Sequence, residues 1–371
     1  MSQDALSQDA LPQGALPQDA VLLADAPRAD APREWARWLP WLLLLLVAVA
    51  VVPLGGSDYL FSAILIPFLT LALAGLGLNI LTGYAGQLSL GSAAFMAVGA
   101  FAAYNFQLRV PGLPLLASFV LGGLTAALLG VVFGLPSLRI KGFYLIVSTL
   151  AAQFFVQWAL TKFPWFSNDN PSGVITAPPL RIVGHDFSTP GGRYWLTLGT
   201  VLVLTVLARN LLGSQTGRRF MAVRDMDTAA RVTGIPILRT KLLAFAISSF
   251  YCGVAGVLWA FCYLGTVEPH GLDLTRSFQV LFIIIIGGLG SVSGSFLGAA
   301  FLVLLPVFLD QAARGLFSGS LDPGNMENAQ KVLFGSLILF FLIKEPEGLA
   351  RLVGSTRQRL AAAWPRSSAA R

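Results

Sequence analysis

Ten apolar runs, each near the length that crosses a lipid bilayer, follow one another along the chain after its first 37 residues. An α-helix rises about 1.5 Å per residue, so roughly 20 residues cover the hydrocarbon core. The eighth and ninth runs are short and fit a broken helix pair, so eight to ten helices are compatible with the pattern. It predicts an all-α, polytopic integral membrane protein. The runs are 38–54, 59–81, 89–108, 113–136, 143–163, 194–212, 241–263, 277–290, 295–310 and 328–344.

The composition supports this interpretation. Of the 371 residues 55% are hydrophobic and 12% are charged, and the mean hydropathy is +0.72. Soluble domains carry about 25% charged residues. The surrounding solvent is therefore expected to be lipid. The net charge of +7 does not predict nucleic-acid binding, because the basic residues lie in the loops between runs, as in proteins whose topology they set.

Three segments divide the chain. Residues 1–37 begin with a five-residue acidic repeat and are predicted to be a disordered cytoplasmic tail. The transmembrane domain is expected at 38–346, and 347–371 is expected to be a basic cytoplasmic tail. The acidic start and the distant first run exclude a secretory signal.

Orientation follows from the distribution of positive charge. With the amino terminus inside, eighteen of the 25 Lys and Arg residues fall on the inner side. This predicts a multi-pass protein of the bacterial inner membrane with both termini cytoplasmic. The insertion 164–193 is then periplasmic, and the loop 214–240 is cytoplasmic.

Catalytic and metal-binding patterns are missing from the sequence. It contains no GxxxxGK[ST] phosphate loop and no GxSxG elbow. His185 and His270 have no neighbours at metal-ligand spacing, and Cys252 and Cys262 are not placed for a disulfide. We expect no catalytic residue, metal or cofactor in this chain. The runs also hold almost no ionisable side chains, so the energy for any transport is expected to come from elsewhere.

Some polar side chains within the runs are candidates for a translocation path. They include Asn79, Gln153 and Gln157, and the two glutamines share one helical face at i,i+4 spacing. Hydrogen bonding between helices is an equally good interpretation of these residues.

Two glycine-rich strings join apolar runs at their inner ends and hint at an internal repeat. Glycine frees the backbone and lets helices approach closely, which suits unwound segments beside a path. Ordinary small-residue packing is the alternative. The candidate residues are Gly83, Gly86, Gln87 and Ser89 in the first string and Gly287, Gly288 and Gly290 in the second.

The loop 214–240 is predicted to contain a short helix. Asp225 and Asp227 suit its start, and Gly234 suits its end. A soluble partner is expected to receive the small face of Ala229 and Ala230 in a cleft. A charged loop that only fixes topology is the alternative.

Three motifs in one order resemble the permeases of branched-chain amino acid ABC importers. They are Gly77–Gly99 (GLNILTGYAGQLSLGSAAFMAVG), Ala222–Phe245 (AVRDMDTAARVTGIPILRTKLLAF) and Gly287–Gly298 (GGLGSVSGSFLG), and the ending Glu345-Pro-Glu-Gly348-Leu is similar too. The long outer insertion makes the chain more similar to the M-type than to the shorter H-type subunit. The resemblance covers most of 75–350.

The resemblance implies a permease that works with a second homologous permease, two cytoplasmic ATP-binding subunits and a periplasmic substrate-binding protein. ATP and Mg²⁺ would then be bound by the partners, and the carried solutes would be branched-chain or other hydrophobic amino acids, or related small acids and amides. The segment Phe166–Val174 and the acidic tail depart from the family pattern, as do Asp225 and Asp227 where many members have Glu. The residues matching the ATPase-coupling loop are Arg224, Asp225, Asp227, Ala229, Ala230 and Gly234.

The sequence therefore predicts a pore-forming subunit rather than an enzyme. The alternative is a self-sufficient secondary transporter or channel for a small polar solute, which the lack of carboxylates within the runs disfavours.

Overall fold

The computed structural model describes residues 57–137, 143–170, 172–182 and 185–317, and the isolated positions 332, 335, 336, 348 and 349. The predicted acidic tail 1–37 and the first apolar run lie outside the described residues. The last run and the basic tail 347–371 do so too, apart from the isolated positions.

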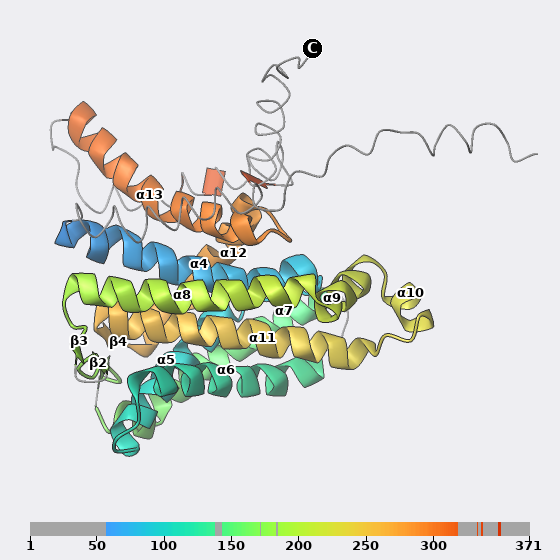
Figure 1. Ribbon diagram of the computed structural model, residues 1–371, viewed down its shortest axis with the longest axis horizontal. Coiled ribbons are helices and arrows are strands. Elements are labelled where there is room, and N and C mark those ends of the chain that lie inside the picture. Colours follow the sequence, from blue (N-terminus) through green and yellow to red (C-terminus); the bar gives the residue numbers. More distant parts are fainter. Residues whose placement is uncertain are drawn as a thin grey trace, which may run out of the picture. The chain divides into compact units, whose positions relative to one another are not determined.

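The described chain is built almost entirely of helices, and its four strands are two residues long (Figure 1). Several long helices include a π-helical or 3₁₀ turn. In order, the elements are η2 (Leu60–Leu65), α4 (Ile66–Asn79), η3 (Ile80–Tyr84), α5 (Ser92–Arg109), α6 (Leu115–Ser137), α7 (Phe143–Lys162), η4 (Pro164–Ser167), β1 (Ile175–Thr176), β2 (Arg181–Ile182), β3 (His185–Asp186), α8 (Pro190–Gly213), α9 (Gln215–Asp225), α10 (Asp227–Val232), α11 (Ile237–Leu258), η5 (Trp259–Leu264), β4 (Thr266–Val267), η6 (Pro269–Leu272), α12 (Leu274–Gly287) and α13 (Val292–Phe317).

Within the described residues, six helices are long and apolar enough to cross a membrane. A shorter apolar stretch, Val292–Phe308, lies in α13. This confirms the predicted all-α, polytopic membrane fold. The expected helix over 277–290 ends earlier, at Gly287, because Gly288 and Gly290 have φ angles of 116° and 73°. Such backbone angles are outside the helical range.

Two spans form the centre of the bundle. Of the most apolar window in Leu60–Tyr84, 83% is buried, and the corresponding share in Ile237–Leu264 is 72%. The windows in α6, α7 and α8 are 39%, 33% and 39% buried. These three helices therefore expose broad apolar faces to lipid or to another subunit. Glycine permits the close central packing: a Cβ on Gly99 of α5 would strike the backbone of Gly253 in α11.

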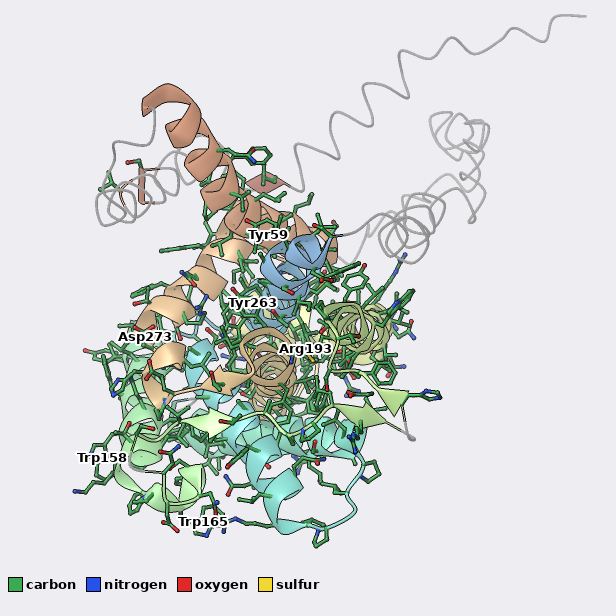
Figure 2. The ribbon with its side chains drawn as sticks, turned by 90° about the vertical axis from the view of Figure 1, so that its left-hand side faces the viewer. Tyr59, Trp158, Trp165, Arg193, Tyr263 and Asp273 are labelled. Atoms are coloured by element: carbon green, nitrogen blue, oxygen red, sulfur yellow. The ribbon has the colours of Figure 1, made fainter. Side chains whose placement is uncertain are left out.

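The two ends of the bundle differ. Strands β2–β4 gather at one end and α9 and α10 lie at the other (Figure 1). At the strand end β1 pairs antiparallel with β4, so the predicted insertion 164–193 is tied to the segment after α11. Figure 2 looks onto this end, with Trp158 and Trp165 at the edge and Arg193 and Tyr263 near the centre. Exposed tryptophans at helix ends are typical of a membrane–water interface.

Local sequence explains where α8 and α9 begin. Thr189 accepts a hydrogen bond from the Gly192 N–H (3.2 Å) and Pro190 occupies the first position of α8. Ser214 ends α8 and starts α9, where its hydroxyl accepts from the Thr216 N–H at 3.1 Å. One serine therefore sets the turn between a membrane span and α9.

Candidate functional site

The first glycine turn, residues 83–91, begins in the last two residues of the π-helical turn η3 and precedes α5. Gly86 has a φ of 68°, which favours glycine. A Cβ on Gly86 would lie 2.8 Å from Cγ of Arg224. A Cβ on Gly83 would overlap Oδ1 of Asn79 and the backbone nitrogen of Gly290. Both glycines are therefore required where other segments approach the turn.

The second glycine turn, residues 287–291, joins α12 to α13. Gly288 and Gly290 have positive φ angles, so the helix stops and the chain reverses. A Cβ on Gly287 would strike the carbonyl oxygen of Gly294, which lets α12 and α13 pack with their backbones in contact.

Asn79 joins the two glycine turns. The residue is fully buried. Its Nδ2 donates to the carbonyl of Ser291 at 2.8 Å and to the hydroxyl of Ser295 at 3.0 Å. Its Oδ1 accepts from the N–H of Gly290 at 2.8 Å. The amide thus satisfies the N–H of Gly290, which the turn leaves without a helical partner, as a bilayer requires.

Arg224 connects this pair of turns to α9. Its Nη1 donates to the carbonyl oxygen of Gly83 at 2.9 Å, across 141 positions of sequence. Its guanidinium also pairs with Asp225 at 2.9 Å. A side chain from the predicted coupling loop therefore contacts the predicted glycine string directly. We call the set Asn79, Gly83, Arg224 and Gly290 the junction.

The predicted helix of the coupling loop is α10. Asp227 is its first residue and pairs with Lys241 of α11 at 2.8 Å, so it fastens α10 to a central span. Gly234 ends the segment with a φ of 81°. The N–H of Ile235 donates to the carbonyl of Ala230 at 3.0 Å, the bond expected when a helix ends in a left-handed glycine.

The two alanines of α10 point in different directions, which corrects the expected Ala-Ala face. Ala229 is exposed, but Ala230 is buried because a single short turn of helix must pack one side against the protein. Next to these alanines, Met226 is 60% exposed just before α10, and Val232, the last residue of α10, is 89% exposed. The sequence reasoning missed both. Their position next to charged residues is the signal that could have indicated exposure to water.

Gln153 is a structural residue of the membrane interior. Its Oε1 accepts from the N–H of Ala94 at 2.6 Å and from the hydroxyl of Ser277 at 3.1 Å. Its Nε2 donates to the carbonyl of Leu272 at 3.0 Å. The hydroxyl of Ser277 accepts from the N–H of Ala93 at 2.9 Å. The first N–H groups of α5, which no helix can satisfy internally, are thereby capped from α7 and α12.

Gln157 has a different environment from Gln153. It lies one turn further along α7, where its Nε2 is 3.1 Å from Nδ1 of His270 in an exposed contact. The structure thus separates two glutamines that sequence spacing treats alike. Gln153 caps the buried start of α5, and Gln157 contacts the 3₁₀ turn η6 that precedes α12.

In the first glycine turn, the side-chain amide of Gln87 is buried and has no hydrogen-bond partner among the described residues. It is 3% exposed, and neither its Nε2 nor its Oε1 has a hydrogen-bond partner within the described residues. Its backbone is engaged, since the N–H donates to the carbonyl of Leu81 at 3.0 Å. Ser89, also buried, accepts from the N–H of Gly91 at 3.2 Å. Of the two side chains, only Gln87 is left without a partner among the residues that the structure describes.

Arg276 is a cation that the sequence reasoning missed, because it lies one residue before the predicted eighth run. Its guanidinium lies 4.3 Å from the centroid of the Trp259 ring, and its Nη1 donates to Gln279 at 2.6 Å. No ion pair of Arg276 occurs within the described part of the chain. Groups of three or more His, Cys, Asp or Glu residues able to hold a metal are also absent from the described ranges.

Several known proteins are similar to this chain. A protein-family model described as "Branched-chain amino acid transport system / permease component" matches residues 60–342. The high-affinity branched-chain amino acid transport system permease protein LivM of Escherichia coli is 30% identical over 300 residues, which cover 74% of this chain. The matched region spans 66% of that protein, just under two thirds of its length.

Two further relatives match less of the chain. The probable branched-chain amino acid transport permease protein LivM of Methanocaldococcus jannaschii is 24% identical over 63% of this chain and 68% of that protein. The autoinducer 2 import system permease protein LsrC of Klebsiella pneumoniae is 34% identical over 30% of this chain and 34% of that protein. No solved structure matches the chain. The family model spans both glycine turns and the α9–α10 segment, and the chain belongs to the family of branched-chain amino acid transport system permease components.

Proposed function

We propose that this chain is the transmembrane permease subunit of an ATP-binding cassette importer in a bacterial inner membrane. Its solutes would be branched-chain or other hydrophobic amino acids, or related small acids and amides. The observation that carries the proposal is the hydrogen bond from Arg224 to the carbonyl of Gly83. It gives a force applied at α9 and α10 a direct route to the π-helical turn that leads into the first glycine turn.

The proposed orientation places α9 and α10 in the cytoplasm and β1–β4 in the periplasm, with both termini cytoplasmic. The asymmetry of Lys and Arg along the sequence supports this orientation. In this orientation the short helices α9 and α10 lie at one end of the bundle and the strands at the other (Figure 1).

The proposed partners are two cytoplasmic ATP-binding subunits, a second homologous permease and a periplasmic substrate-binding protein. ATP and Mg²⁺ would bind to the ATP-binding subunits. Met226 and Val232 are exposed apolar side chains at α10, where an ATP-binding subunit would contact them. The apolar face of α8 leaves room in the membrane for the second permease.

The proposed mechanism begins when ATP-dependent closure of the partners shifts α9 and α10. Arg224 transmits the shift to Gly83, and Asn79 transmits it to Gly290, so both glycine turns move as one unit. Turns with positive φ angles between packed helices are the segments expected to change shape. Gln87 is the proposed solute contact of the path, because its buried amide lacks partners among the described residues.

Reconstitution into proteoliposomes tests the proposal. The chain would be co-reconstituted with the permease, ATP-binding subunits and binding protein encoded beside it, and uptake of labelled leucine, isoleucine and valine would be followed. We expect uptake that requires ATP and that stops when the ATP-binding subunits are omitted. Uptake by this chain alone would instead favour a self-sufficient transporter or channel.

A further inference from the structure

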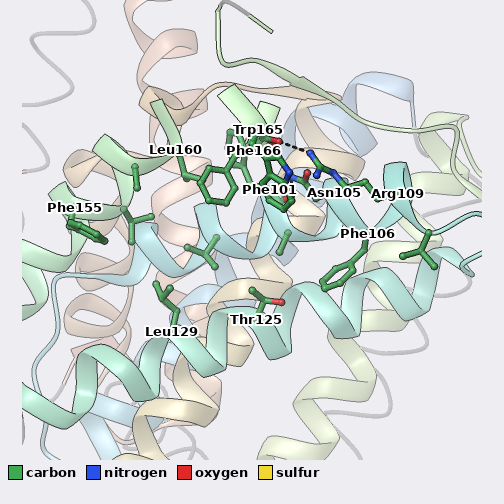
Figure 3. Close-up of a pocket in the computed structure, with 15 residues that line it drawn as sticks. Phe101, Asn105, Phe106, Arg109, Thr125, Leu129, Phe155, Leu160, Trp165 and Phe166 are labelled. Atoms are coloured by element: carbon green, nitrogen blue, oxygen red, sulfur yellow. Dashed lines mark hydrogen bonds between the residues drawn. The ribbon is translucent and has the colours of Figure 1, made fainter. Parts of the chain in front are cut away.

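An apolar cavity of about 470 Å³ opens between α5, α6 and α7 (Figure 3). Its volume lies in the range of sites that hold small molecules, roughly 300–1,000 Å³. Aromatic and aliphatic side chains form most of its wall, among them Phe101, Phe106, Leu129, Phe155 and Leu160.

The polar side chains of the wall have already used their donors. Nδ2 of Asn105 donates to the carbonyls of Phe101 and Phe166, each at 2.8 Å. The hydroxyl of Thr125 donates to the carbonyl of Leu121 at 2.8 Å. Oδ1 of Asn105 has no donor among the described residues, but it is buried in the wall. The cavity therefore suits hydrocarbon rather than a polar solute.

A cation lies at the rim of the cavity. Arg109 is exposed at the end of α5, and its guanidinium lies 3.7 Å from the centroid of the Trp165 ring. Its Nη2 donates to the carbonyl of Trp165 at 2.8 Å (Figure 3). An arginine carries five N–H donors, and Arg109 makes no ion pair within the described ranges. Several charged donors at the rim are therefore available to a ligand.

The cavity lies at the periphery of the helix bundle, close to side chains that the bundle exposes. Leu124 and Leu128 of α6 are 52% and 67% exposed, and Phe154 and Trp158 of α7 are each 53% exposed. In a membrane these side chains face lipid. Trp165 beside the cation is 55% exposed, as expected of an aromatic residue at the level of the lipid headgroups. The cation is thus placed at headgroup level, and the cavity is placed at the level of the acyl chains.

We propose that this cavity is a site for an anionic phospholipid, with an acyl chain between α5, α6 and α7 and the phosphate on Arg109. Burying the chain gives little preference, because the chain leaves an equally apolar bilayer. Selectivity must then come from the headgroup, where a guanidinium binds phosphate through charge-assisted hydrogen bonds. A headgroup of net negative charge is favoured over a zwitterionic one, whose own cation competes with Arg109.

Native mass spectrometry of the full chain in detergent tests the site. Phosphatidylglycerol and phosphatidylcholine with identical acyl chains would be titrated separately. We expect phosphatidylglycerol to bind about tenfold more tightly, because the choline cation of phosphatidylcholine competes with Arg109 for the phosphate that both headgroups carry. Arg109→Gln should abolish this preference. Arg239→Gln, an exposed arginine of α11 at the opposite end, should leave it unchanged.

A second variant tests the apolar half of the site. Ala159 lines the cavity, so Ala159→Phe should fill it and weaken the binding of both lipids. Equal binding of the two lipids to the unmodified chain would overturn the proposal, as would an unchanged preference in Arg109→Gln. Because Arg109 is exposed, its variant should fold even if Ala159→Phe does not. The result does not depend on transport.

Discussion

Arg224 and Gly83 lie 141 residues apart in sequence and are joined by a 2.9 Å hydrogen bond from Nη1 to a carbonyl oxygen. Because the acceptor is a backbone carbonyl, a movement of Arg224 would shift the main chain at Gly83 directly. Because Gly83 also contacts Gly290 and Asn79, one arginine reaches both glycine turns.

Asn79 should be important for stability. In Asn79→Leu the N–H of Gly290 loses its partner inside the protein, whereas the carbonyl of Ser291 keeps the N–H of Ser295 at 3.3 Å. Buried unpaired polar groups cost about 1–3 kcal/mol each, although hydrogen bonds between membrane helices often contribute less. We expect the free energy of unfolding in detergent to fall by about 1–3 kcal/mol. Asn210→Leu, at an exposed position of α8, is the control and should change it little.

Gly83 should tolerate no side chain. Gly83→Ala would force Asn79 and Gly290 apart, and we expect a loss of thermal stability and of transport. Gly199 provides the contrast, because it lies inside α8 and a Cβ added there would meet nothing within 4 Å. Gly199→Ala should be neutral or stabilising by up to about 1 kcal/mol, since alanine favours helix. Equal melting temperatures for the two variants would contradict the close contact at Gly83.

Gln87 and Gln153 form a matched pair of buried glutamines. Gln87→Leu removes an amide without partners among the described residues, so stability should hold or rise while solute uptake falls. Gln153→Leu leaves the Ala94 N–H and the Leu272 carbonyl without partners and should destabilise the protein by about 1–3 kcal/mol. Thermal unfolding and uptake should be measured on both variants. Normal uptake by Gln87→Leu would remove this residue from the proposed path.

Val232 should be required for binding of the ATP-binding subunits. Val232→Asp places a charge on the exposed apolar side of α10, and we expect the subunits to be lost when the complex is purified. Gln215→Asp adds the same charge at an exposed position of α9 and is the control. A complex that survives Val232→Asp intact would place the contact elsewhere.

The sequence predicted the helical fold because apolar runs of bilayer length need no knowledge of contacts. It also singled out both glycine turns, since few other residues adopt the φ angles of Gly86 and Gly288. It could not show that Arg224 meets Gly83, because spacing carries no information on contacts between distant segments. Nor could it separate Gln153 from Gln157, whose different roles depend on helices α5 and α12.

The sequence predicted one short helix in the loop 214–240, but the structure has two there, α9 and α10, and Asp225 ends α9. The sequence also did not reveal the exposed face of α10. The identity of the outward-facing residues depends on which side of α10 packs, and Ala230 is buried there while Val232 is exposed. A six-residue helix is too short for a periodic pattern to reveal its buried side.

The central claim is that Arg224 transmits the action of the ATP-binding subunits to the glycine turns. It is tested most directly by the amount of solute taken up per ATP hydrolysed in proteoliposomes containing the whole importer. Arg224→Met should leave the complex assembled and hydrolysing ATP while this ratio falls about tenfold, the loss expected for one charge-assisted hydrogen bond. Arg224→Lys should recover part of it. An unchanged ratio in Arg224→Met would contradict the account.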